Sequence, residues 1–230
     1  MKKGFLLLAL IAFVSHTLIA QIGGLTSFNS LNIPGSARIA AMGGSYFAIK
    51  DGDIHLAQYN PSLLDSNMHN KLGMSFVDYF SGVSIGYASY ARSVKPKLTA
   101  GATMQFCNFG KQAELTGLGD EIGSFNAADY ALTLGAGYQY DSLWSMGANL
   151  KTIYSALANY TSLAVAVDAA VTYSKPSKNF TASLILSNFG AQLKTYTTGV
   201  REKLPFEMQI ALKKTCSCTI SFFARILQYA

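Results

Sequence analysis

Few side chains in this sequence have the type and spacing needed for catalysis. Beyond residue 20 there are only two histidines, His55 and His69. Neither stands in a spacing that marks a Ser–His–Asp arrangement, so polar surface contacts are the more common role for them. Asp120 and Glu121 could bind a cation in a loop, although adjacent loop carboxylates are more often simply solvated. The sequence therefore predicts no catalytic residue and a protein that is not an enzyme.

Metal and cofactor sites are equally poorly indicated. The three cysteines are Cys107, Cys216 and Cys218, an odd number that argues against a disulfide framework and leaves a single disulfide as a minor alternative. Two cysteines separated by one residue do not match a zinc spacing. Gly117-Leu118-Gly119 lacks the third glycine of a dinucleotide-binding loop. We expect neither a metal nor a cofactor.

One pair of charges is more informative. Asp168 interrupts an apolar run, and Lys151 lies on the same face of the preceding predicted strand. A charge facing lipid is costly, so both should point to the inside of the fold, within reach of an ion pair. The alternatives are two separately solvated charges, or a contact between Asp168 and Arg38.

The elements that carry these residues alternate with a period of two. Apolar and small or polar residues alternate through eight segments, which indicates strands with one wet face. A soluble β-sandwich also alternates, but these segments are longer than ordinary strands and have aromatic residues near their ends. The segments lie near 71–79, 84–92, 98–106, 129–140, 144–154, 162–174, 179–188 and 206–214.

Composition supports a membrane location. Of the 230 residues 50% are hydrophobic and only 13% are charged, whereas soluble domains have about 25% charged residues. Residues 1–20 resemble a signal peptide, and no later apolar run reaches the length of about 18 residues that marks a transmembrane helix. The formal net charge of +6 comes without a basic run, so we do not expect nucleic-acid binding. The remaining membrane fold is a closed β-barrel in the outer membrane.

The lengths of the connections between strands predict how the barrel is oriented in the membrane. Long connections at 107–128 and 189–205 fit extracellular loops, and tight ones fit periplasmic turns. Side chains alternate between the two faces of a strand, so if Tyr140 and Trp144 both face lipid, they pair across a three-residue loop. The same alternation also allows Ser174 to pair with Asn179 across 175–178.

The segment 21–70 does not alternate and is predicted to be a short helical plug inside the barrel, because it is too short for a core of its own. A short helix ended by glycines is followed by acidic residues and an Asn-Pro-Ser turn. The residues of this plug motif are Ala37, Arg38, Met42, Gly43, Gly44, Asn60 and Pro61.

This motif resembles the N-terminal hatch of FadL-like barrels. The stretches LNIPGSARIAAMGG, DIHLAQYNPSLL and MHNKLGMSFVDYFSGVSIGYASYAR are more narrowly similar to the PorQ family of the type IX secretion system of Bacteroidota. The resemblance runs from about Gly23 to Leu212. It implies an all-β fold, an antiparallel FadL-like transmembrane β-barrel with an N-terminal plug, of which about eight strands are present here.

The resemblance also implies a function. Members of the family lie in the outer membrane with PorU-like, PorV-like and PorZ-like proteins as a complex that attaches secreted cargo, bearing a C-terminal signal, to the cell surface. The PorQ-like member docks the PorZ-like protein. A FadL-like transporter of hydrophobic compounds is the alternative. Residues 215–230 no longer look like the family, so we expect an aberrant tail, a truncated chain and an incompletely closed barrel.

Overall fold

The structure is a computed structural model of the 230-residue chain. It describes residues 26–44, 48–117, 119–197, 199–214 and 220–226. The expected signal peptide, residues 1–20, lies outside the described residues. So do the start of the expected plug and most of the expected tail.

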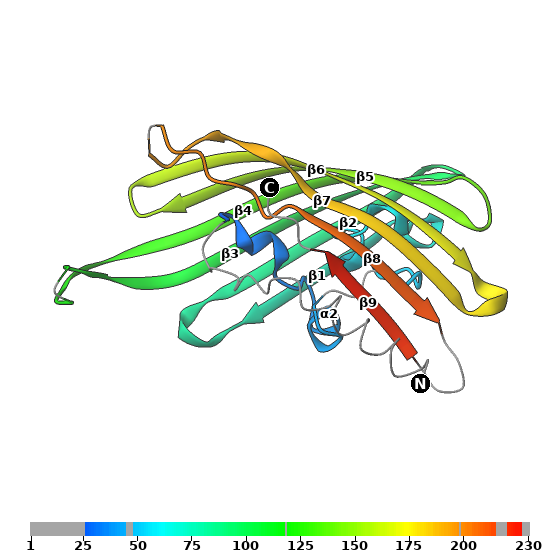
Figure 1. Cartoon of the computed structure of the whole chain (residues 1–230), viewed down its shortest axis with the longest axis horizontal. Helices are drawn as coiled ribbons and strands as arrows, with labels where there is room; N and C mark the ends of the chain where they lie inside the picture. Colours follow the sequence, from blue (N-terminus) through cyan, green and yellow to red (C-terminus); the bar gives the residue numbers. More distant parts are fainter. Residues whose placement is uncertain (1–25, 45–47, 118, 198, 215–219, 227–230) are drawn as a thin grey trace, which may run out of the picture.

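The fold is all-β, as predicted. Nine antiparallel strands form one sheet in which every strand pairs with its neighbour in the chain, and the sheet curls around the N-terminal segment (Figure 1). The strands are β1 (Lys71–Asp78), β2 (Ser84–Lys95), β3 (Leu98–Leu115), β4 (Glu121–Gln139), β5 (Trp144–Leu157), β6 (Tyr160–Lys175), β7 (Phe180–Lys194), β8 (Glu207–Lys214) and β9 (Ile220–Ile226).

Eight of these strands occupy the predicted range of 71–214, and the ninth lies in the segment expected to be an aberrant tail. Strand β9 pairs with β8 from Lys214↔Ile220 to Met208↔Ile226. The ladder among the described strands runs from β1 to β9 and contains no pairing between these two. No described helix is both long and apolar enough to cross a membrane.

The two faces of the sheet have opposite chemistry. On β4 the exposed side chains include Leu132 and Leu134, at 43% and 50% exposure, while the intervening Thr133 is 3% exposed. Strand β5 repeats the pattern, with Leu150 at 47% and Lys151 at 3%. We call the apolar, exposed side the outer face and the polar, buried side the inner face. The alternation that predicted the strands thus separates an apolar outside from a polar inside.

The predicted loop at 107–128 is wrong in extent. Strands β3 and β4 continue to Leu115 and from Glu121, so only residues 116–120 connect them. The connection after β7 is long as predicted, although it covers 195–206 because the strand extends to Lys194.

One of the two predicted hairpin registers holds. Tyr140 donates its backbone N–H to the carbonyl of Trp144 at 3.1 Å, across the predicted three-residue loop. The other register is wrong, because Ser174 pairs with Thr181 rather than with Asn179. The turn contains η6 (Pro176–Lys178), and Asn179 leaves it with a φ of 48°, in the left-handed region.

The N-terminal segment consists of short helical turns on the inner face. They are η1 (Asn29–Asn32), α2 (Ala37–Ala41), η2 (Ile54–Leu56), η3 (Pro61–Leu63) and η4 (Ser66–Met68), with η5 (Phe80–Gly82) between β1 and β2. Their apolar side chains form small clusters with the sheet. In one, Ile39, Leu56 and Leu63 pack with Ala170 of β6 and Ile185 of β7.

Candidate functional site

The Asn-Pro-Ser turn anchors the N-terminal segment to the middle of the inner face. The side chain of Asn60 caps η3 by accepting the N–H of Ser62 at 3.1 Å. The Ser62 hydroxyl lies 2.6 Å from the hydroxyl of Thr172 on β6. Thr172 in turn lies 2.7 Å from the hydroxyl of Ser183 on β7. All four side chains are buried, so each hydrogen bond satisfies a polar group that has lost its water.

Two glycines make room for this turn. A Cβ on Gly147 would lie 2.4 Å from the carbonyl of Pro61, and one on Gly137 would lie 2.5 Å from the carbonyl oxygen of Leu64. Both clashes are with backbone atoms. The small residues on the inner face of β4 and β5 therefore allow the backbone of η3 to lie directly against the sheet.

The helical part of the motif forms a separate local unit. Ser36 caps α2 by accepting the N–H of Ile39 at 3.3 Å. After Met42 the chain leaves the helix through Gly43 and Gly44, whose φ angles are 89° and 76°. Residues other than glycine rarely adopt such φ values. Met42 packs against the cluster around Ile39, which ties the helix end to the inner face.

Arg38 stays within the N-terminal segment. It forms ion pairs with Asp51 and Asp53, the second at 2.8 Å. Burial raises the pKa of Asp51, but the hydrogen bond and the charge of Arg38 outweigh it and leave that pKa below its usual value. The alternative of a contact between Arg38 and Asp168 is therefore not what the structure shows.

The structure brings Lys151 and Asp168 together. The ammonium nitrogen of Lys151 lies 2.8 Å from a carboxylate oxygen of Asp168, with the side chains 3% and 0% exposed. In the ladder Asp168 is opposite Asn149 and Lys151 is opposite Ala166, so the pair is diagonal. The charges face the inner side, as parity requires.

A polar network surrounds this pair, and the sequence did not reveal its centre. Asn188 accepts a hydrogen bond from Lys151 at 2.9 Å through its side chain and donates its backbone N–H to Asp168 at 2.8 Å. Asn149 donates to Asp168 at 3.1 Å and to the carbonyl of Gln58 at 3.0 Å. Both members of the ion pair thus have further hydrogen-bond partners, and Asn149 links the pair to the N-terminal segment.

Asp129 on β4 forms a second polar centre. It is 8% exposed. It accepts hydrogen bonds from the hydroxyls of Ser30, at 2.6 Å, and of Ser155. Nearby, Gln105 donates to the carbonyl of Ser30 at 2.6 Å. Asp129 begins the predicted strand 129–140, but the alternation of that segment gave no signal that sets this residue apart.

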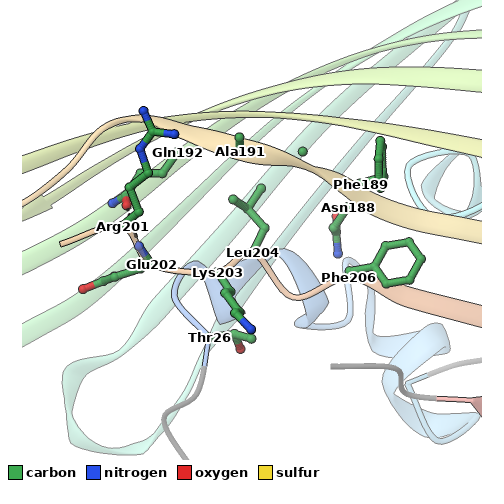
Figure 2. Close-up of a pocket in the computed structure, with 11 residues that line it drawn as sticks. Thr26, Asn188, Phe189, Ala191, Gln192, Arg201, Glu202, Lys203, Leu204 and Phe206 are labelled. Carbon is green, nitrogen blue, oxygen red and sulfur yellow. Dashed lines mark hydrogen bonds between the residues drawn. The ribbon is translucent and has the colours of Figure 1, made fainter. Parts of the chain in front are cut away.

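Two cavities lie at the end of the sheet that holds the connections after β3, β5 and β7. The first, of about 340 Å³, lies between β7 and the segment 201–206, beyond the last β7–β8 pair, Ser187↔Glu207. Figure 2 shows Leu204 between these segments and the rings of Phe189 and Phe206 at one side. In the same view Arg201 points toward Gln192, whereas Lys203 points the other way, toward Thr26. The second cavity, of about 570 Å³, is bounded by Asp129 and by aromatic rings.

The two histidines considered for catalysis are not among the residues of the polar networks or the two cavities described above. His55 lies in η2, and the ring of His69 accepts the backbone N–H of Ser93 at 3.2 Å. Cys107 is buried and free. In the described part of the chain no group of three or more potential metal ligands occurs. A scan against protein-family models and a search of curated proteins gave no match to this chain.

Proposed function

We propose that the chain forms part of a β-barrel wall in the bacterial outer membrane. The observation that carries this proposal is the exposure of aliphatic side chains at the centre of the sheet. Leu132, Leu150 and Val167 are 43%, 47% and 43% exposed, in the middle of β4, β5 and β6. On the inner face of the same strands the charged groups are buried. A water-soluble protein has the opposite distribution, with apolar side chains inside and charged side chains outside. Apolar side chains on the outer face are what contact with lipid requires.

Within that membrane, the proposed role is that of a PorQ-like docking component of the type IX secretion system. It would hold a PorZ-like protein in an attachment complex with PorU-like and PorV-like proteins. The support is the sequence resemblance together with the way the N-terminal segment is fixed. Buried hydrogen bonds from Ser62 to Thr172 and from Ser30 to Asp129 hold this segment against the inner face. A platform for a protein partner benefits from such rigidity, because less order is lost on binding.

The cavity between β7 and 201–206 favours a second candidate function. Its lining is largely apolar, and it lies where the ladder between β7 and β8 has stopped (Figure 2). A hydrophobic solute would have room there between β7 and the segment 201–206. This is the observation that supports a FadL-like transporter.

Deletion of the gene in its host tests the two roles against each other. A docking component predicts release of C-terminal-signal cargo into the medium and loss of the PorZ-like protein from purified outer membranes. Complementation with the wild-type gene and with His55→Ala/His69→Ala should restore both, because neither histidine is assigned a chemical role. Normal cargo anchoring together with reduced uptake of a hydrophobic compound would instead establish the transporter.

Labelling of single cysteines tests the membrane orientation. In a cysteine-free background, Gly117→Cys lies in the connection after β3 and Ser177→Cys lies in the turn at the other end of the sheet. A membrane-impermeant maleimide should modify the first on intact cells and the second only after the outer membrane is opened. Equal modification of both on intact cells would refute the orientation.

A further inference from the structure

A cavity at the connection end of the inner face combines aromatic walls with a buried carboxylate. Its volume is about 570 Å³, and it lies among η1, β3, β4 and β5 and the connection after β7. The aromatic side chains that bound it are Phe28, Phe109, Phe125 and Tyr196. Phe28 and Tyr196 stack with their ring centroids 6.3 Å apart, so two of these rings lie side by side.

The carboxylate of Asp129 lines the same cavity. It is 8% exposed, and its hydrogen-bond donors, Ser30 and Ser155, are neutral hydroxyls. The ion pairs among the described residues are those of Arg38 and Lys151, and neither includes Asp129. A buried charge is normally balanced by an opposite charge. None of the ion pairs among the described residues places a cationic side chain within 4 Å of the Asp129 carboxylate.

A second carboxylate, that of Glu202, lies near Tyr196. Glu202 accepts a hydrogen bond from the hydroxyl of Ser27, next to Phe28. Burial is the main cause that raises the pKa of Tyr196; the hydrogen bond to Ser155 lowers this pKa, and the negative charges of Asp129 and Glu202 raise it. The phenol of Tyr196, which donates to Ser155 at 2.5 Å, therefore lies in the field of both carboxylates. An aromatic surface attracts cations through the negative face of its rings, so walls and floor favour the same sign of ligand charge.

We propose that this cavity binds an organic cation, a guanidinium or ammonium group on an apolar stem. The cationic group would approach Asp129 while its stem contacts the aromatic rings. Such a cation occurs on free small molecules and on arginine or lysine side chains of proteins, and the cavity chemistry is the same for both. The inference does not depend on the role in secretion.

The test is a binding titration on the full chain in micelles of a non-ionic maltoside detergent, which carries no cationic group of its own. Butylguanidinium is the probe, and butylurea, a neutral molecule of closely similar shape, is the ligand control. We expect saturable binding of butylguanidinium by calorimetry and no measurable binding of butylurea. Equal binding of the two, or binding of neither, would overturn the proposal.

Three variants locate the site. Asp129→Asn should weaken butylguanidinium binding at least tenfold, whereas Asp120→Asn, the same charge change on an exposed residue of the β3–β4 connection, should leave it unchanged. Tyr196→Leu keeps the carboxylate and should weaken binding severalfold, which decides the question if Asp129→Asn fails to fold. Equal affinity in the wild type and in whichever of Asp129→Asn and Tyr196→Leu are folded would place the cation elsewhere and refute the assignment.

A peptide probe separates the two sources of the cation. If acetyl-Gly-Arg-Gly-amide binds at least as tightly as butylguanidinium, with the same loss in Asp129→Asn, the site accepts a protein side chain. If the peptide is excluded while butylguanidinium binds, the ligand is a free small cation.

Discussion

Replacing Gly147 with alanine should displace the N-terminal segment from the inner face. The added Cβ would lie 2.4 Å from the carbonyl carbon and oxygen of Pro61 and 2.7 Å from the amide nitrogen of Ser62. Non-bonded carbon atoms prefer separations of about 3.5–4.0 Å. All three contacts are with backbone, so no change of rotamer relieves them, and either η3 or β5 must move by about 1 Å.

The size of the effect follows from two opposing terms. Forcing one extra carbon into a packed interior costs about 1–3 kcal/mol. Alanine in a strand interior regains about 0.5–1 kcal/mol of the conformational entropy that glycine loses on folding. The free energy of unfolding of Gly147→Ala should therefore fall by about 1–2 kcal/mol.

The assay is urea unfolding in detergent, combined with hydrogen exchange of the amides in 54–64. Gly117→Ala is the matched control, because no atom lies within 4 Å of its added Cβ. We expect a lower unfolding midpoint and faster exchange in 54–64 for Gly147→Ala alone. If the two variants are equally stable and equally protected, the close contact between η3 and β5 does not exist.

Two further predictions concern the charged pairs. Lys151→Met should lower the free energy of unfolding by about 3–5 kcal/mol, because it leaves the carboxylate of Asp168 buried without its cation, and Lys151→Met/Asp168→Leu should recover part of that loss in the same urea assay. The pKa of Asp51 is lowered in the folded chain, so the stability from its pair with Arg38 is present above the unfolded pKa of about 3.9 and is lost as the pH falls further. The stability difference between wild type and Arg38→Gln should accordingly be constant from pH 7 to pH 5 and shrink below about pH 4, and a difference that grows on acidification would contradict this reasoning.

Alternation in the sequence predicted the strands and their faces because it reports which side of a strand is buried. It was enough to place Lys151 and Asp168 on one face and within reach of each other. It failed where the side chains on both faces of a strand are exposed. Residues Lys111 and Glu114 of β3 are exposed, so no alternation remains there, although the ladder to β4 continues through them.

The alternation of side chains could not predict the strand registers or the β-bulges. Pairing Ser174 with Asn179 or with Thr181 leaves every side chain on the same face, because the two choices differ by two residues, so parity could not decide between them. Asn188 has a φ of 58° at an irregularity in the β6–β7 ladder. This bulge turns the asparagine toward the ion pair, and a pattern of period two contains no signal for it.

The contacts within the sheet and the contacts that hold the N-terminal segment differ in how far apart their residues lie in the sequence. Every strand pairs with its sequence neighbour, so the hairpins can form one after another with short loop closures. The contacts that fix the segment join residues far apart in the sequence: Ser62 and Thr172 have a sequence separation of 110, and Asn32 and Asn188 one of 156. These two contacts can therefore form only once β6 and β7 are in place.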